Sequence, residues 1–434
     1  MRFRLFWRRS ATAAGVYVSA ALGFAATVAA ARLLGPRDFG VFAIAIATAA
    51  FVQVLLDSTV EEAVVKYGFR YAKQDDLSRL RRLFTVASVV KLAGASLAAL
   101  VIAAFAPLAG AVFGIEGIVA PLLIAATLPL VQAPEGIAGA ALMVRGRYDL
   151  RGAFMAVSMA FRLAGIAVGA SYGVTEAVAG VVVGQAFASL AVAAAGAAML
   201  SPLLRARSRP LGADRGPLRR FVLHSAATTA LVAARASLAP VLVGVVASPV
   251  QVGYFRAAQA PMTGFFSLSA PARLILFAEQ TSDFEAGRLD RVYRLLGRYV
   301  LAAVAAAVAI VPLLWWQMPA VVRLLYGAEF LPAVDAMRLI TVAGAIWLVF
   351  GWTKSFPVSI GRPDLRILAH GVETAVLVPL IVLLAGPWGA TGAAGAMLAS
   401  TAVFAAVWLV LLVRIRTGHV AARRPAAPSE AVLP

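Results

Sequence analysis

A chain of 434 residues that is 62% hydrophobic and 14% charged is not a soluble globular protein, in which about 25% of residues are usually charged. Its formal net charge of +19 would suggest a nucleic-acid-binding protein, but the basic residues lie mainly in short segments between apolar runs, as in a membrane protein. With no cysteine in the sequence, disulfides, thiol chemistry and iron–sulfur clusters are excluded.

The apolar residues form runs of about 20, the length that crosses a bilayer core of about 30 Å. The runs are continuous and rich in Ala and Leu, so they predict helices rather than strands. The first run is too long for a signal peptide and is interpreted as a retained helix. The sequence predicts an all-α integral membrane protein of about twelve transmembrane helices, at 11–34, 39–57, 83–106, 117–143, 152–171, 178–200, 221–247, 252–278, 299–318, 337–359, 364–386 and 390–413.

The basic residues follow the order of these runs. If the N-terminus is cytoplasmic, most of the 39 Lys and Arg residues fall in alternate, cytoplasmic segments. The outer segments hold few basic residues, among them Arg37 and Arg323. Because a missed helix would invert half of this pattern, we expect an even number of spans with both termini in the cytoplasm.

Two short stretches indicate an internal repeat. Gly35–Phe42 reads GPRDFGVF and Ser248–Phe255 reads SPVQVGYF, with Pro, Gly and an aromatic residue at matching positions. Each follows a pair of arginines and a long apolar run, where Pro and Gly suit a tight corner between two helices. We therefore expect two six-helix bundles related as a parallel repeat around a central cavity. The predicted divisions are an N-terminal bundle at 1–200, a cytoplasmic linker at 201–220, a C-terminal bundle at 221–414 and a disordered cytoplasmic tail at 415–434.

Charged side chains at membrane depth are costly and are therefore candidate functional residues. At a rise of 1.5 Å per residue, five basic residues lie within the runs: Arg162, Arg235, Lys91, Lys354 and Arg256. This excess predicts a cavity for an anionic ligand, since arginine can hold the oxygens of a pyrophosphate with two donors at once. The alternative for each is snorkelling, or an ion pair that only holds helices together.

Two acidic residues lie within the runs, Glu135 and Glu373. They are candidates for binding a coupling proton or sodium ion, and the alternative is a structural pairing with arginine. His370 shares a helical face with Glu373, which suits either a buried structural histidine or a proton relay. The sequence contains no P-loop motif and no clustered histidines. It therefore predicts a protein that is not an enzyme and has no cofactor and no metal site.

The segment ARLLGPRDFGVFAIAIATAAFVQVLLDSTVEEAVVKY resembles the opening of Wzx-type polysaccharide flippases. These belong to the multidrug/oligosaccharidyl-lipid/polysaccharide exporter superfamily. The family pattern falls on Arg32, Leu34, Gly35, Phe39, Gly40, Asp57, Ala63 and Lys66. Three later stretches, VGYFRAAQ, LLYGAEFLPAVDAMRLI and GPWGATGAAGAMLAS, resemble further family motifs in the same order. The chain departs from the pattern after Arg235, where an acidic residue is common, and at Glu61-Glu62, where small or apolar residues are common.

The resemblance implies a flippase in the bacterial cytoplasmic membrane. It would move an undecaprenyl-pyrophosphate-linked oligosaccharide from the inner to the outer leaflet for assembly of a surface polysaccharide such as O-antigen or exopolysaccharide. Its partners would be this lipid, membrane lipids and glycosyltransferases or a polymerase, with no nucleic acid. Three alternatives remain: a lipid II flippase, a drug/cation antiporter, which would want an acid-lined cavity, and a non-transporting scaffold of a glycan-synthesis complex, which has no need of charges at membrane depth.

Overall fold

The computed structural model describes residues 2–56, 60–204, 206–362 and 364–422. All regular elements in these ranges are helical, which confirms the all-α prediction. The first eight are α1 (Arg2–Leu56), α2 (Val60–Lys73), α3 (Leu77–Phe113), α4 (Val119–Ala125), α5 (Leu128–Val144), α6 (Tyr148–Ala170), α7 (Val174–Leu204) and the 3-10 helix η1 (Gly212–Asp214). The remainder are α8 (Arg215–Val246), α9 (Pro249–Ala258), α10 (Ala260–Glu285), α11 (Leu289–Leu325), η2 (Ala328–Ala333), α12 (Val334–Val349), η3 (Gly351–Lys354), α13 (Phe356–Ser359) and α14 (Asp364–Ala422).

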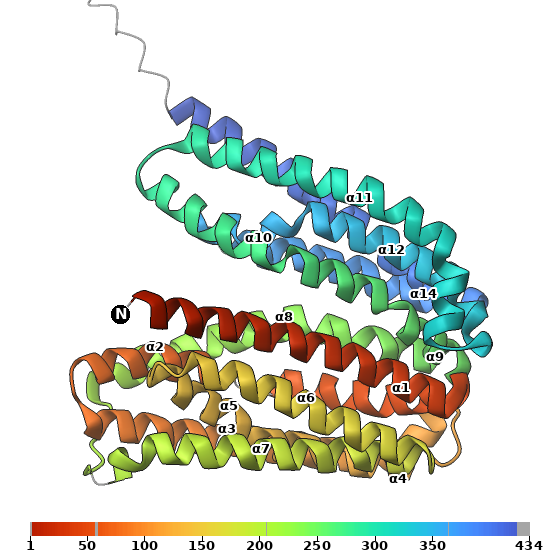
Figure 1. Cartoon of the computed structure of the whole chain (residues 1–434), viewed down its shortest axis with the longest axis horizontal. Coiled ribbons are helices and arrows are strands. Elements are labelled where there is room, and N and C mark those ends of the chain that lie inside the picture. The colour runs from red at the N-terminus through yellow and green to blue at the C-terminus, as the bar shows by residue number, and fades with distance from the viewer. Residues whose placement is uncertain (1, 57–59, 205, 363, 423–434) are drawn as a thin grey trace, which may run out of the picture.

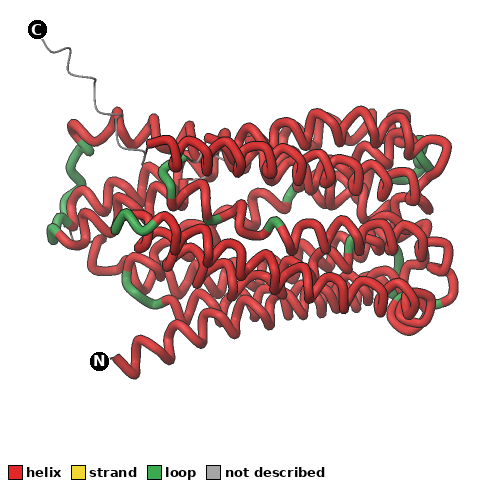
Figure 2. The backbone as a smooth tube through the Cα atoms, turned by 90° about the horizontal axis from the view of Figure 1, so that it is seen from above, coloured by secondary structure: helices red, strands yellow, loops and turns green. Residues whose placement is uncertain are grey.

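The helices form two groups that run along the long axis of the molecule (Figures 1 and 2). One group contains α1 to α7, and the other contains α10, α11, α12 and α14. The groups meet near α9 and diverge towards the end at which the chain begins (Figure 1). Helix α8 packs against both α1 and α14, so it lies between the two groups. The start of α1 and the end of α14 lie at the same end of the molecule.

Eight helices of the described residues are long and apolar enough to cross a membrane. The two longest, α1 and α14, each contain one glycine with non-helical backbone angles, Gly35 (φ 70°, ψ 174°) and Gly389 (φ 54°, ψ −134°). A side chain rarely tolerates such a positive φ, so glycine is required where each helix bends. Each bend separates two of the predicted apolar runs, while two other runs divide between α4 and α5 and between α9 and α10. The count of twelve spans stays a prediction.

The two corner stretches of the predicted repeat pack against each other. A Cβ atom built on Gly40 would overlap the carbonyl oxygen of Pro249, and one built on Gly253 would overlap that of Pro36. Each corner thus places its glycine against the proline of the other, which is the reciprocity expected of segments related by a local twofold axis. The two helices α1 and α9 can approach so closely because glycine has no side chain.

The segment predicted as a linker is largely helical and is fastened to the N-terminal group. Helix α7 continues to Leu204 and α8 begins at Arg215. Between them, the Asp214 carboxylate accepts hydrogen bonds from the Tyr71 hydroxyl at 2.8 Å and from Arg70 at 3.1 Å. Burial, and then the bond to Asp214, raise the pKa of Tyr71 to about 12. Because this pKa lies above the unfolded value of 10.0, the stabilisation is complete below pH 10 and is lost as the pH rises to about 12.

We predict that Asp214→Ala lowers the free energy of unfolding by about 1.5–3 kcal/mol at pH 7, because it removes the acceptor of a hydrogen bond that involves a charged group. The ion pair between Asp214 and the exposed Arg70 contributes little to this loss of unfolding free energy. Thermal unfolding of the detergent-purified protein, followed by tryptophan fluorescence, measures the loss. Glu116→Ala removes an exposed carboxylate and is the matched control. Equal melting temperatures for the two variants would contradict the fastening of the linker.

Candidate functional site

A cavity of about 560 Å³ lies where the two groups of helices face each other. We call it the central cavity. Its walls come from both bent segments of α1, from α6 and α7, and from α8, α9 and α10. Residues Phe39, Phe42, Ala43, Ile46, Ala47 and Ala50 of α1 line it at helical spacing, so one face of α1 forms a wall. Most of the lining is apolar, and the charged groups in it are two arginines.

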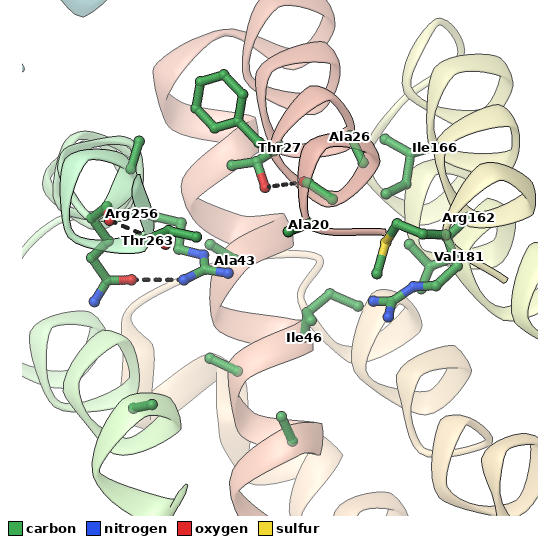
Figure 3. Close-up of a pocket in the computed structure, with 18 of the residues that line it drawn as sticks. Ala20, Ala26, Thr27, Ala43, Ile46, Arg162, Ile166, Val181, Arg256 and Thr263 are labelled. Carbon is green, nitrogen blue, oxygen red and sulfur yellow. Dashed lines mark hydrogen bonds between the residues drawn. The ribbon is translucent and has the colours of Figure 1, made fainter. Parts of the chain in front are cut away.

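Arg162 enters the central cavity from α6 (Figure 3). Its Nε atom is buried and has no hydrogen-bond partner among the described residues. Tight packing of α6 on α7 fixes its position, because a Cβ on Gly165 would overlap the Gly180 backbone and one on Gly180 would overlap that of Gly165. A half-buried arginine whose buried Nε is an unused donor is suited to an anionic ligand.

Arg256 faces Arg162 from the opposite wall (Figure 3). It lies in the last turn of α9, where a basic side chain also interacts favourably with the free carbonyl groups of the helix end. Its Nη1 atom donates to Gln259 Oε1 at 2.6 Å. Helix α9 ends here because Pro261, in the first turn of α10, has no N–H to continue the hydrogen-bond ladder. The cavity thus carries one arginine from α6, in the first group of helices, and one from α9, where the two groups meet.

The other predicted basic residues lie elsewhere. Lys91 is buried and forms an ion pair with Glu61 at 2.6 Å. Lys354 lies at the end of η3 with its Nζ 4.7 Å from the centre of the Phe266 ring, and it does not line the central cavity. Arg235 lies on α8, but its side chain is outside the described residues. The structure therefore brings together two of the five predicted basic residues.

The two predicted acidic residues occupy different environments. Glu373 is completely buried on α14, and its Oε2 lies 3.1 Å from Nδ1 of His370. The His370 ring packs against both Trp347 and Phe404, with ring centres at 5.7 and 5.1 Å, and these two rings also stack on each other at 4.6 Å. The pair therefore sits in an aromatic cluster away from the central cavity. Glu135 accepts a hydrogen bond from Gln185 Nε2 at 2.5 Å.

A second cavity, of about 400 Å³, lies within the N-terminal group of helices. We call it the polar chamber. It is lined by the polar side chains of Gln53, Glu61, Lys91, Gln132, Glu135 and Arg151. Gln53 Nε2 donates to Gln132 Oε1 at 3.0 Å, which links α1 to α5. A Cβ on Gly136 would overlap the Glu61 carboxylate, so the glycine makes room for this acid.

Sequence reasoning missed the two chamber glutamines and Gln259, because it searched the apolar runs for charges only. An amide within an apolar run was the available signal, since Gln is also costly in a membrane unless it finds partners. Glu61 was noticed as a departure from the family pattern, and its partner Lys91 explains it. In the part of the chain that the structure describes, no three His, Asp or Glu side chains gather as a metal site.

A family model described as "Polysaccharide biosynthesis protein" matches residues 29–335. A search of curated protein sequences finds no significant match. Among solved structures, the fold is similar to an inward-facing multidrug resistance MATE family transporter of the MOP superfamily, with 12% identity, a TM-score of 0.77 and coverage of 94% of this chain and 96% of the other. It is also similar to the lipid II flippase MurJ in an inward closed conformation, with 13% identity, a TM-score of 0.72 and coverage of 92% and 87%. An outward-facing MATE family transporter of the MOP superfamily has 13% identity, a TM-score of 0.58 and coverage of 94% of this chain. At these identities the likeness concerns the fold.

Proposed function

Because the chain belongs to the family of polysaccharide biosynthesis proteins, we propose that it is a flippase for an undecaprenyl-pyrophosphate-linked oligosaccharide. It would move this lipid from the inner to the outer leaflet of the bacterial cytoplasmic membrane for surface polysaccharide assembly. The observation that carries the proposal is the pair Arg162 and Arg256 on opposite walls of the central cavity.

The chemistry of the cavity suits a lipid pyrophosphate. Two guanidinium groups can engage several phosphate oxygens with paired donors, and they act strongly where little water competes. The lining of the central cavity holds two arginines and no acid, and Glu135 in the polar chamber acts on Arg162 alone. This excess of positive charge is costly in an apolar lining, so a ligand that neutralises it explains why the arginines are there. The polyprenyl tail can remain in the bilayer while the polar head passes between the two groups of helices.

The arrangement of the two groups of helices supports an assignment of the end from which the lipid enters the central cavity. The groups diverge at the end where the chain begins and meet at the opposite end (Figure 1). At that opposite end, Gly40 packs against Pro249 and Gly253 packs against Pro36. We assign the divergent end to the cytoplasm, because most of the basic loop residues lie there. The TM-score of 0.77 with an inward-facing transporter, against 0.58 with an outward-facing one, supports the same assignment.

The second candidate function is flipping of lipid II, favoured by the similarity to MurJ. Its substrate presents the same pyrophosphate to the same arginines. A drug/cation antiporter fits less well, because the central cavity carries basic and not acidic charge. We assign ion coupling to Glu135 or Glu373 as part of this proposal. Glycosyltransferases or a polymerase would supply and consume the lipid-linked glycan.

Deletion of the gene tests the proposal. We expect a lipid-linked oligosaccharide to accumulate on the inner leaflet and surface polysaccharide to be lost, with both restored by a plasmid copy. Leaflet position is measured by accessibility of the glycan to an added glycosidase in spheroplasts and in inverted vesicles. Accumulation of lipid II instead would favour the second candidate. Normal surface polysaccharide without accumulation of any lipid-linked glycan would overturn the flippase proposal.

A further inference from the structure

The central cavity and the polar chamber follow one another along the same face of α6. Arg151 and Met155 line the chamber, and Met155, Met159 and Arg162 line the central cavity. These positions are three or four residues apart, so they lie on one side of the helix. Met155 borders both spaces, and the charges of Arg162 and Arg151 both act on Glu135. The two spaces are therefore neighbours.

Helix α1 repeats this arrangement on the facing wall. Ala43, Ala47 and Ala50 line the central cavity, and Gln53, one turn further along, lines the chamber. Alanine side chains leave space beside the helix, and the glutamine adds the first polar group. Along both helices, the chamber is therefore the next space from the cavity that holds Arg162 and Arg256.

The chamber is lined by groups that recognise hydroxyl-rich ligands. Each glutamine amide has two donors and two acceptor positions. Among the described residues, the bond between Gln53 and Gln132 occupies one of these on each side chain. The carboxylates of Glu61 and Glu135 add acceptors at the same wall. The volume of about 400 Å³ is in the range of pockets that bind small molecules.

The charges of the chamber balance. Glu61 is paired with Lys91 at 2.6 Å, and Glu135 lies in the field of Arg162 and Arg151. Two acids and two bases line the space, so it has no excess charge to attract a uronic acid or an amino sugar. Uncharged hydroxyl and acetamido groups are the matching chemistry.

We propose that the polar chamber binds the first, uncharged sugar of the lipid-linked glycan, with Gln53 and Gln132 as its hydrogen-bonding residues. The inference rests on the proposed function, because the arginines of the central cavity must hold the adjoining pyrophosphate. It assigns recognition of the sugar to a space inside one group of helices and recognition of the phosphates to the cavity between the groups.

Binding to the detergent-purified full chain tests the proposal. The probes are undecaprenyl pyrophosphate without sugar and the same lipid carrying N-acetylglucosamine, galactose or glucuronic acid. We expect the wild-type protein to bind at least one neutral-sugar lipid more tightly than the bare carrier and than the glucuronic acid lipid. The double variant Gln53→Leu/Gln132→Leu should lose about tenfold in affinity for that lipid and bind the bare carrier as the wild type does.

A second variant and a control complete the design. Gly139 lines the chamber, and a Cβ on it meets nothing within 4 Å, so Gly139→Met should fill the space and weaken binding of the same sugar-bearing lipid. Gln317→Leu, at an exposed position on α11, should change neither affinity.

The outcomes separate the two proposals. Failure of the wild-type protein to bind any of the lipids would overturn the proposed function together with this inference. Equal binding of bare and sugar-bearing lipids, or unchanged binding by both chamber variants, would overturn the chamber alone. Loss of bare-carrier binding in the chamber variants would also overturn it, because the chamber would then belong to the pyrophosphate site.

Discussion

Gly40→Ala is expected to hold the two groups of helices apart at the end where they now meet. The new methyl group would overlap the Pro249 carbonyl oxygen, and backbone atoms cannot move aside as a flexible side chain can. Overpacking of this kind costs about 1–3 kcal/mol, which changes the ratio of closed to open states by roughly 5- to 150-fold. We therefore expect transport to fall by one to two orders of magnitude, with Gly253→Ala acting alike because its contact with Pro36 is reciprocal.

The absence of cysteine from the sequence allows a direct measurement of this change. A single cysteine at Thr27, which lines the central cavity, reports access through its rate of labelling. An impermeant thiol reagent added outside the cell should label it faster when Gly40→Ala is present. Gly297→Ala is the control, because a Cβ there meets nothing within 4 Å and alanine favours a helix. Unchanged labelling and transport in both corner variants would show that these corners are not a gate.

The double variant Arg162→Ala/Arg256→Ala is expected to abolish flipping while the protein still accumulates in the membrane. Each hydrogen bond to a charged ligand contributes about 1.5–3 kcal/mol, so each arginine lost should cost roughly 10- to 150-fold in affinity. Stability should fall little with Arg162→Ala, because the Nε atom of Arg162 has no partner in the described structure. Glu135, on which the charge of Arg162 acts, keeps the hydrogen bond from Gln185 and the charge of Arg151.

Lysine substitutions distinguish the contribution of the positive charge from that of the paired donors of arginine. Arg162→Lys and Arg256→Lys keep the charge but lose the paired donors, so each should retain part of the activity. Arg338→Ala is the matched control, because Arg338 pairs with Asp335 at 3.1 Å and lies outside the central cavity. Flipping is measured with the purified lipid in proteoliposomes, and abundance by immunoblotting of membranes. Full activity of the double alanine variant would remove the central cavity from the mechanism.

The contrast between Lys91 and Arg162 shows where sequence reasoning stops. Both are basic residues within long apolar runs, and both were predicted to meet an anionic ligand. The structure pairs Lys91 with Glu61, an acid on a short helix that the apolar runs did not predict. Arg162 faces the central cavity instead. Depth in a membrane can be counted along the chain, but the neighbour on the next helix cannot.

Three features follow from the amino-acid sequence without a structure: the all-helical membrane character, the corners at Gly35–Phe42 and Ser248–Phe255, and the small set of charges at membrane depth. These are local properties, set by runs of apolar residues, by turn-forming Pro and Gly, and by the cost of a charge away from water. Three contacts became visible in the folded chain alone: Arg162 and Arg256 share a cavity, the two corners pack together through Gly40 and Gly253, and Gln53 forms a hydrogen bond with Gln132. Such contacts join helices far apart in the chain, and they depend on how the surfaces of those helices fit, which no stretch of sequence specifies alone.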